Sequence, residues 1–218
     1  MTTIFNYPRL SIFVPDENKV LAIKNLYRQR TPIIYVGSMT ETKGGLFHMI
    51  RAMGIIRDQR PDILLLLVGP VERGVRQRML DAIEAGNLHD CVDVIGFIPH
   101  QDVVNYISIA KVGLIANQPT PKFRKNIPIK QFEYMACGVP VLGADLPPIA
   151  SFVRAAGCGM VFDSTNPQAL AEGVLTMLQD EREWQRMSEA GKKAVRDMWN
   201  WDRMEHRLFD IYEKLGIS

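Results

Sequence analysis

Short apolar runs alternate with longer segments of helical periodicity along most of the chain after about residue 32. Several of the short runs are apolar without alternation, which is the pattern of strands covered on both faces. We expect strands at 33–37, 63–69, 92–96, 112–116, 139–142 and 159–162. We expect helices near 44–58, 72–86, 101–110, 128–137 and 166–179. The sequence therefore predicts an α/β fold with a Rossmann-like, doubly wound parallel sheet of about six strands.

The two ends of the chain do not follow this pattern. Residues 1–31 contain two prolines and no second strand partner, so we interpret them as an interdomain linker. The sheet domain then spans 32–180. Residues 181–218 are highly charged, have helical spacing throughout and carry all three tryptophans. These C-terminal helices either pack on the sheet domain or reach toward a further domain, and the pattern leaves both interpretations open.

Composition narrows the class of protein. A chain of 218 residues that is 47% hydrophobic buries one sizeable core. Its net charge of +2 is spread along the chain, so no concentrated basic surface for nucleic acid is visible. The N-terminus lacks the features of a signal peptide, and the longest apolar run, 63–69, is too short to cross a bilayer. Three widely spaced cysteines and four unclustered histidines indicate neither a disulfide framework nor a metal site, so we expect a cytoplasmic protein.

The loop after the first predicted strand has the composition of an anion site. Ligands of open parallel sheets bind at the carboxyl ends of the strands. Gly37 permits a tight turn there, and Lys43 precedes a glycine pair that opens the next helix. A cation beside a helix start suits a phosphate. The alternative is an ordinary strand-to-helix turn capped by Thr40 or Thr42.

The loop after the third predicted strand is a candidate for contacts with a flat base. Gly96 and Phe97 end the strand, and a helix follows from Gln101. Exposed backbone groups at such a strand end are able to pair with a base, with Phe97 packed beside it. The alternative, which the local sequence favours, is a hydrophobic staple from Phe97 to the next helix.

The loop after the fourth predicted strand is basic. Four cations fall within nine residues, next to a helix start: Lys122, Arg124, Lys125 and Lys130. Three prolines limit the freedom of this loop. The arrangement suits a phosphate receptor, whereas a solvated surface loop is the plainer alternative.

The helix predicted at 128–137 carries two charges in an apolar context. Pro128 suits the first helical position, which leaves free N–H groups at the helix start. Lys130 and Glu133 share a face, while Ile129 and Phe132 turn to the core. One helical turn rises about 5.4 Å, so Lys130 is able to meet a phosphate while Glu133 accepts hydrogen bonds from a vicinal diol. The alternative is an amphipathic helix whose two charges lie on its wet face as an ion pair worth about 0.3 kcal/mol.

The segment "PIKQFEYMACGVPVLGADLPPIASFV" resembles the donor-site segment of GT-B glycosyltransferases of the retaining, Glu-x7-Glu type. The resemblance extends in order through "YVGSMTETKGG", "LLLVG", "VDVIGFIPHQDVVNYISIAKVGLI", "AAGCGMVF" and "MWNWDRMEHRLFDIYEKL". It implies that the chain is the C-terminal, nucleotide-sugar-binding half of a GT-B fold. The N-terminal acceptor-binding domain, which takes a glycan or lipid-linked acceptor, is then missing from this chain.

The resemblance also assigns roles to residues. Glu133 matches the second Glu of the motif, which holds the ribose hydroxyls. Lys43 matches the lysine that contacts the donor diphosphate. The backbone around Ile127 and Ile129 matches the amides that cradle the phosphate, and the loop from Gly96 to Ile98 matches the base-binding edge.

Three positions depart from the family pattern. Lys125 stands where the first Glu of the motif touches the donor sugar, Ser38 stands where an arginine often follows the first-strand glycine, and Pro128 stands where the helix usually starts with glycine. We hypothesise that Lys130, together with Arg124 or Lys125, compensates for the missing cation and amide.

These features predict the donor-binding domain of a hexosyltransferase of polysaccharide or glycoconjugate synthesis. Its substrate is a UDP- or GDP-linked sugar, and it needs no cofactor. Lys43 and Lys130 are the expected catalytic residues, because fixed cations stabilise the leaving diphosphate. The expected donor-binding residues are Gly37, Ser38, Gly96, Phe97, Ile98, Arg124, Lys125, Ile127, Ile129 and Glu133. The isolated domain should be inactive, and the full-length protein should be cytoplasmic or peripheral at the membrane.

Three other classes of function compete with this one. A non-catalytic nucleotide-binding or interaction module that kept the fold remains open, and Lys125 in place of Glu is its main support. A dinucleotide-dependent oxidoreductase is excluded because no G-x-G-x-x-G follows the first predicted strand. A glycosidase is not supported, because no carboxylate pair has an acid and base role.

Overall fold

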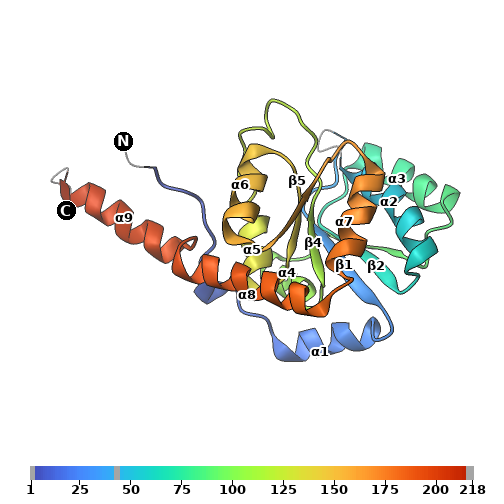
Figure 1. The fold of residues 1–218 in the computed structure, drawn as a ribbon, viewed down its shortest axis with the longest axis horizontal. Coiled ribbons are helices and arrows are strands. Elements are labelled where there is room, and N and C mark those ends of the chain that lie inside the picture. The colour runs from blue at the N-terminus through green and yellow to red at the C-terminus, as the bar shows by residue number, and fades with distance from the viewer. Residues whose placement is uncertain (1–2, 42–44, 215–218) are drawn as a thin grey trace.

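The computed structural model describes residues 3–41 and 45–214, and within them the chain forms one parallel sheet covered by helices on both faces (Figure 1). The strands are β1 (Thr31–Val36), β2 (Ile63–Val68), β3 (Val92–Gly96), β4 (Val112–Ile115), β5 (Val141–Ala144) and β6 (Gly159–Phe162). Their order in the sheet is β3-β2-β1-β4-β5-β6, and every pair is parallel. The predicted doubly wound sheet and all six predicted strands are confirmed, with β5 starting two residues later than expected.

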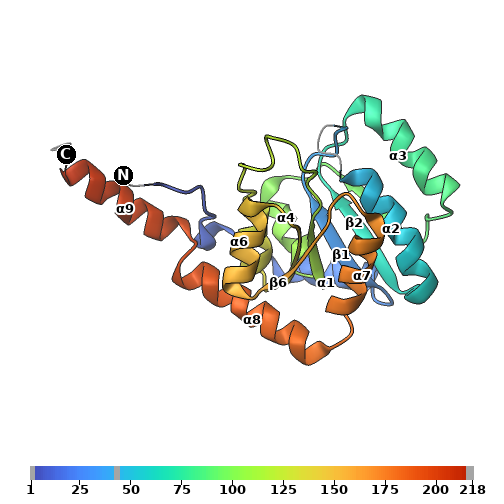
Figure 2. The same cartoon turned by 45° about the horizontal axis from the view of Figure 1, so that its top comes forward.

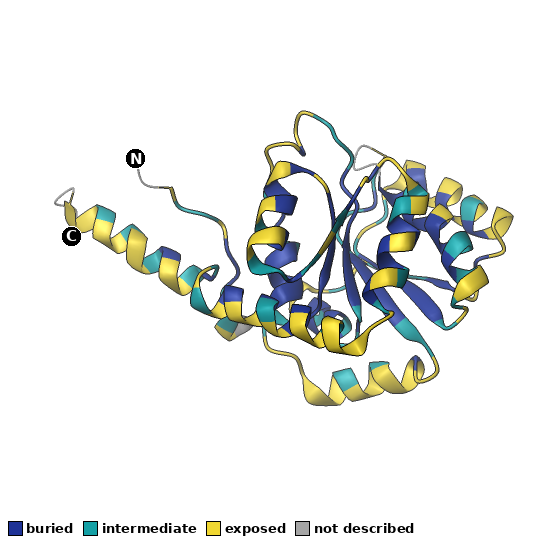
Figure 3. Cartoon of the chain, in the orientation of Figure 1, coloured by how far each residue is buried: buried dark blue, intermediate teal, exposed yellow. Residues whose placement is uncertain are grey.

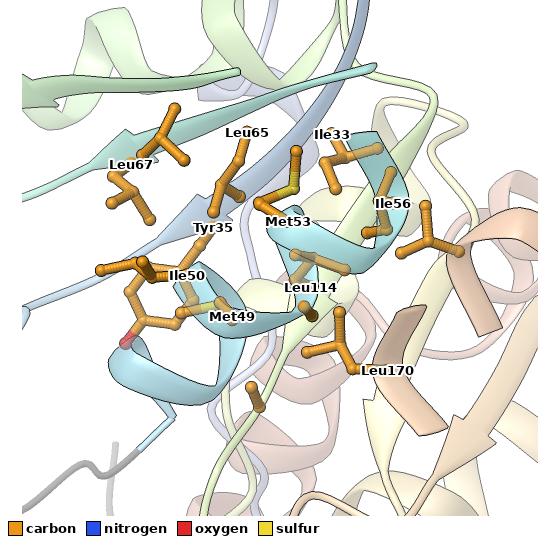
Figure 4. Close-up of a cluster of buried hydrophobic side chains, with 14 of the residues drawn as sticks. Ile33, Tyr35, Met49, Ile50, Met53, Ile56, Leu65, Leu67, Leu114 and Leu170 are labelled. Carbon is orange, nitrogen blue, oxygen red and sulfur yellow. The ribbon is translucent and has the colours of Figure 1, made fainter. Parts of the chain in front are cut away.

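Two apolar layers enclose the sheet. One face is covered by α2 (Leu46–Gln59), α3 (Arg73–Ala85) and α7 (Pro167–Met177), and the other by α4 (His100–Ile107), α5 (Lys130–Ala136) and α6 (Pro147–Ala156). Successive side chains of β1 and β2 alternate between the layers, and all six residues of β2 are buried. Figure 4 shows Met49, Met53 and Ile56 of α2 packed on strand residues in the first layer, and Figure 3 shows the strands dark blue between yellow-edged helices. Burial on both faces explains why the strands read as unbroken apolar runs.

The helix predictions were right in most places and incomplete in two. Asn166 caps the start of α7, where it accepts a hydrogen bond from the Gln168 N–H, and Gly86 ends α3. Helix α6 was not predicted, although Pro147 opens it and Gly157 closes it in the left-handed region with φ of 62°. Helix α1 (Glu17–Leu26) was also not predicted and lies within the segment interpreted as a linker.

Helix α5 corrects the prediction for 128–137. It begins at Lys130 rather than at Pro128, whose carbonyl instead accepts a hydrogen bond from the Gln131 N–H at 3.3 Å. The five residues from Gln131 to Met135 are all buried. An amphipathic helix with a wet face is therefore wrong, because α5 lies between the sheet and α8 (Glu181–Asp197) and is covered on both sides.

Tyr134 of α5 ties two central strands together. Its hydroxyl accepts a hydrogen bond from the Val36 N–H at 2.9 Å and donates one to the Leu114 carbonyl at 3.4 Å. A Cβ at Gly113 would lie 2.4 Å from the Tyr134 ring, so only glycine permits this approach. Strands β1 and β4 are the pair at which the winding of the sheet reverses, and Tyr134 fastens α5 at that point.

The N-terminal segment meets the residues that follow α8 on the α5 and α6 side of the sheet. Tyr7 is buried against Phe132 and Phe152, with Tyr7 and Phe132 ring centroids 4.8 Å apart, and the Trp201 N–H donates to the Pro8 carbonyl at 2.9 Å. Trp199 packs edge-on against Phe152 at 5.0 Å. The rest of α9 (Trp201–Lys214) projects away from the sheet, as Figures 1 and 2 show from two directions. These tryptophans therefore have partners within the chain, while the outer part of α9 extends beyond its core.

Candidate functional site

A cavity of about 420 Å³ opens at the carboxyl ends of β1 and β4, where the winding of the sheet reverses. Ligands of doubly wound sheets bind at such a reversal. The cavity is lined by the end of β1, the loop after β4, and the starts of α4 and α5. The lining residues are Tyr35, Val36, Gly37, His100, Asn117, Lys122, Phe123, Asn126, Pro128, Ile129, Lys130 and Glu133.

Lys130 holds a positive charge against the end of β1. Its Nζ donates a hydrogen bond to the Val36 carbonyl at 2.8 Å and lies 3.9 Å from the centroid of the Tyr35 ring, a cation–π contact. Burial raises the pKa of Tyr35 to about 12, so the ring stays neutral. Gly37 has φ of 138°, and a Cβ there would lie 3.4 Å from Lys130 Nζ. The structure thus brings Gly37 and Lys130 together at the carboxyl end of β1.

Glu133 lines the same cavity and is only 3% exposed. Its Oε1 lies 3.0 Å from Nε2 of His100, the first residue of α4. Because a carboxylate only accepts hydrogen bonds, Nε2 is the donor. The structure thus brings Lys130 and Glu133 into one cavity, one helical turn apart.

The cations of the loop after β4 separate in space. Lys122 lines the cavity beside Asn126. Arg124 instead borders a neighbouring hollow with Asp145 and Asp163, and Lys125 is exposed and outside the cavity lining. Arg124 and Lys125 therefore do not accompany Lys130 as hypothesised, and Lys122 takes their place.

Of the expected phosphate cradle, Ile129 lines the cavity, whereas Ile127 is outside its lining and half-buried against the α5 side of the core. The residue after Gly37 is also outside the lining. Among the described residues, none accepts a hydrogen bond from the backbone N–H of either isoleucine. Ser38 follows Gly37, and its carbonyl accepts a hydrogen bond from the Tyr35 hydroxyl at 3.3 Å.

The conformation of the loop after β3 excludes a hydrophobic staple, one of the two interpretations given for this loop. Gly96 has φ of 76°, and Phe97 is 74% exposed. A hydrophobic staple from Phe97 is therefore wrong, because a staple would bury the ring. Ile98 is partly buried against the core instead. The base-binding role of Gly96, Phe97 and Ile98 stays a prediction.

Part of the loop after β1 lies outside the described residues. Lys43 and Thr42 belong to this part, so the phosphate contact predicted for Lys43 and the capping role of Thr42 stay predictions. Helix α2 begins after Gly45 at its N-cap rather than after Thr40. Gly45 is required there, since a Cβ would lie 2.2 Å from the Ala116 carbonyl oxygen.

The sequence did not single out six residues of the cavity lining, and Tyr35, His100 and Asn117 are among them. Tyr35 sits inside an apolar strand and reads as core. His100 was visible in "GFIPHQD", directly after a strand end, but its partner Glu133 is 33 residues away. Asn117 is 5% exposed and has no hydrogen-bond partner among the described residues, although it follows β4 at the sheet edge where ligands bind.

Two negative observations hold for residues 3–41 and 45–214. No group of three or more histidine, cysteine, aspartate or glutamate side chains there is placed to hold a metal ion. No helix of that part of the chain is long and apolar enough to cross a membrane.

Comparison with known proteins agrees with the resemblance of the motifs. A GDP-mannose-dependent monoacylated alpha-(1-6)-phosphatidylinositol monomannoside mannosyltransferase of Corynebacterium glutamicum is 26% identical over 94% of this chain. The match covers 53% of that protein, so this chain spans about half the length of its relative.

Solved structures share the fold. Anabaena Alr3699/HepE, in complex with UDP, superposes on 98% of this chain and 57% of its own with a TM-score of 0.85 at 14% identity. The C-terminal domain of a glycosyl transferase group 1 family protein (LpcC) of Francisella tularensis superposes on 88% of this chain and 98% of its own, with a TM-score of 0.75 at 15% identity. The fold is thus that of the C-terminal half of GT-B glycosyltransferases, as predicted. Residues 16–194 match the model of the family described as Glycosyl transferases group 1, and the chain belongs to that family.

Proposed function

We propose that this chain is the donor-binding half of a glycosyltransferase that transfers a hexose from a nucleoside-diphosphate sugar. One observation carries the proposal: Lys130 and Glu133, one turn apart on α5, line a single cavity at the reversal point of the sheet. A cation and a carboxylate at this separation match a diphosphate and a ribose diol of one nucleotide. Membership of the family supports the same assignment.

Each part of the donor has a candidate partner. Glu133 accepts hydrogen bonds from the ribose hydroxyls, and Lys130 faces the diphosphate with Lys122 as a second cation. The backbone N–H groups of Ile127 and Ile129 bind phosphate oxygens. The loop from Gly96 to Ile98 borders the base, and Lys43 keeps its expected role at the diphosphate.

The chemistry proposed is stabilisation of the leaving group. Transfer breaks the bond between the anomeric carbon of the sugar and the diphosphate oxygen, which leaves negative charge on the nucleoside diphosphate. The Lys130 ammonium is already held by Val36 and Tyr35, so little reorganisation is needed when this charge develops. Retention of the anomeric configuration, which the motif implies, is checked by NMR of the product made by a full-length protein.

The donor and the acceptor follow from the relatives only in outline. The mannosyltransferase relative is named as GDP-mannose-dependent, and the Anabaena structure holds UDP, so both bases are candidates. The acceptor, a glycan or a lipid-linked glycan of polysaccharide or glycoconjugate synthesis, binds a half of the protein that this chain does not contain. We place the protein in the cytoplasm, because Cys91, Cys137 and Cys158 are free thiols and a reducing compartment maintains these.

The alternative is a nucleotide-binding module without transferase activity. Lys125 supports it, because the first Glu of the family motif is absent and Lys125 is exposed outside the cavity lining. Nucleotide binding is common to both functions. Sugar transfer by a full-length protein carrying this domain separates them, and only the first function predicts it.

Calorimetric titration of the purified chain with UDP, GDP and ADP, free and sugar-linked, tests the binding site. We expect one base to bind with a Kd below about 1 mM, and Lys130→Met and Glu133→Gln to weaken that binding about tenfold each or more. Lys24→Met and Glu213→Gln change exposed residues of the same types on α1 and α9 and should leave the Kd unchanged. Absence of binding by every nucleotide would refute the donor site.

A further inference from the structure

Glu133 is a buried carboxylate whose one hydrogen-bond partner among the described residues is His100. The two groups come from different elements, α5 and the start of α4, and both line the cavity. The exposures are unequal, because the Glu133 side chain is 5% exposed and the His100 side chain 73%. The contact thus joins the buried Glu133 carboxylate to the exposed His100 imidazole at the mouth of the cavity.

Burial of a carboxylate is unfavourable unless hydrogen bonds satisfy it. An ionised carboxylate offers about four acceptor positions on its two oxygens. The bond from His100 uses one of them and fixes Oε1, which restricts rotation of the carboxylate about its last torsion. The remaining acceptor positions are then held in one orientation toward the cavity before a ligand arrives.

His100 is itself held in place although it is exposed. Pro99 precedes it at the N-cap of α4 and restricts the backbone there. The Phe13 ring lies beside the imidazole, with centroids 6.2 Å apart. Helix α4 is fastened to the segment around α1, since Asn105 accepts a hydrogen bond from the Asp16 N–H at 2.8 Å. The donor to Glu133 therefore comes from a helix start whose position is set by Pro99, by Phe13 and by the contact of α4 with the segment around α1.

We propose that His100 is a positioning residue, which holds the Glu133 carboxylate in the orientation that receives the two ribose hydroxyls of a nucleoside diphosphate. This inference rests on the proposed function, because it requires the ribose diol at Glu133. It differs from displacement, in which the ligand would have to break the contact between His100 and Glu133 in order to bind. Positioning makes His100 favourable for ribonucleotide binding, whereas displacement makes it unfavourable.

The test asks whether the effect of replacing His100 depends on the ribose hydroxyls of the ligand. We compare the whole chain with His100→Ala and His100→Gln by calorimetry, using the ribonucleoside diphosphate that binds and its 2′,3′-dideoxy counterpart. His89→Ala is the matched control, because His89 is an exposed histidine whose Nε2 pairs with Glu84 Oε2 at 2.6 Å away from the cavity. Urea unfolding of each variant verifies that it is folded.

His100→Ala should weaken binding of the ribonucleotide about tenfold and change binding of the dideoxynucleotide less than about twofold. His100→Gln should restore most of the loss, because its amide also donates a hydrogen bond, and His89→Ala should have no effect. Equal weakening for both ligands, no weakening, or tighter binding would overturn the positioning role. If the unchanged chain binds the dideoxynucleotide as tightly as the ribonucleotide, the ribose assignment of Glu133 in the proposed function fails instead, and the inference fails with it. If the unchanged chain binds neither nucleotide, the proposed donor site itself fails.

Discussion

At the scale of single side chains, two buried asparagines differ in their hydrogen bonding. Asn200 is 4% exposed and satisfied, since its Nδ2 donates to the carbonyls of Val195 and Arg196 and its Oδ1 accepts from the Arg203 N–H. Asn117 is 5% exposed, lines the cavity and has no such partner among the described residues. The Asn117 amide borders the cavity and is not one of the fully buried, unpartnered polar atoms, so it is open to a hydrogen bond from water or from a ligand.

The two asparagines should therefore respond differently to truncation. Asn200→Ala should lower the free energy of unfolding by about 1–3 kcal/mol, because it removes satisfied hydrogen bonds. Asn117→Ala should leave that free energy nearly unchanged, because it removes no hydrogen bond among the described residues, while weakening the binding of a nucleotide sugar. Urea unfolding and calorimetry on both variants measure these effects. A large loss of stability in Asn117→Ala would show that the residue is structural.

At the scale of elements, the junction of β1, β4 and α5 places the site. Tyr134 supplies a hydrogen bond to each strand, and the same short helix carries Lys130 and Glu133. The backbone of the sheet edge and the two charged groups thus share one rigid support. Burial raises the pKa of Tyr134 well above its usual value, so the hydroxyl remains protonated.

Tyr134→Phe should destabilise this junction. The variant leaves the partly buried Val36 N–H without its acceptor, which costs about 1–3 kcal/mol of unfolding free energy. Tyr212→Phe is the control, because Tyr212 is 41% exposed on α9. Urea denaturation of the two variants checks the difference, and equal midpoints would contradict the role of the hydroxyl.

The turn before β2 provides a prediction about pH. The Arg60 guanidinium, hydrogen-bonded to Asp62 at 2.8 Å, holds the pKa of that carboxyl well below its usual range, and the Thr31 hydroxyl adds to the effect. A carboxyl with a lowered pKa stabilises the fold above its unfolded pKa of about 3.9. This contribution is lost as the pH falls from there toward the folded pKa.

Asp62→Asn should accordingly reduce stability at pH 7 and less so at low pH. The loss should be below about 1 kcal/mol, because the ion pair is more than a third exposed and screened by solvent. Urea unfolding at pH 7 and at pH 3 measures the gap between the variant and the unchanged chain. A gap that widens on acidification would contradict the assignment.

At the scale of the whole molecule, an aromatic cluster joins parts of the chain that are distant in sequence. Tyr7, Phe132, Phe152 and Trp199 pack edge to face and connect the N-terminal segment to α5, α6 and the end of α8. The N-terminal segment therefore lies along the same face of the molecule as α8 and the start of α9, as Figure 1 shows. The sheet and its cavity form one unit, while the outer part of α9 projects from it.

The purified chain should bind its nucleotide sugar and transfer nothing. It spans about half the length of its mannosyltransferase relative, and transfer needs an acceptor held against the donor. The measurement is product formation from a radiolabelled donor with glycan and lipid-linked acceptors. Detectable product from this chain by itself would contradict the prediction.

The sequence by itself determined the sheet, its parallel winding and the edge at which the cavity opens. Apolar runs without alternation specify strands buried on both faces, and this information is local. Gly37 marked a turn for the same reason. The donor-site motif identified the family because its residue spacing is contained within one helix and its flanking strand.

Only the tertiary structure decided which charges meet. The sequence left open whether Lys130 and Glu133 lie on a wet face, but α5 is covered by the sheet and by α8, and both groups line one cavity. Arg124 and Lys122 are two residues apart and face different hollows, and His100 reaches Glu133 from another helix. Which charged side chains share a cavity depends on how separate elements pack against one another. The residue pattern of a single element does not specify which elements will be its neighbours.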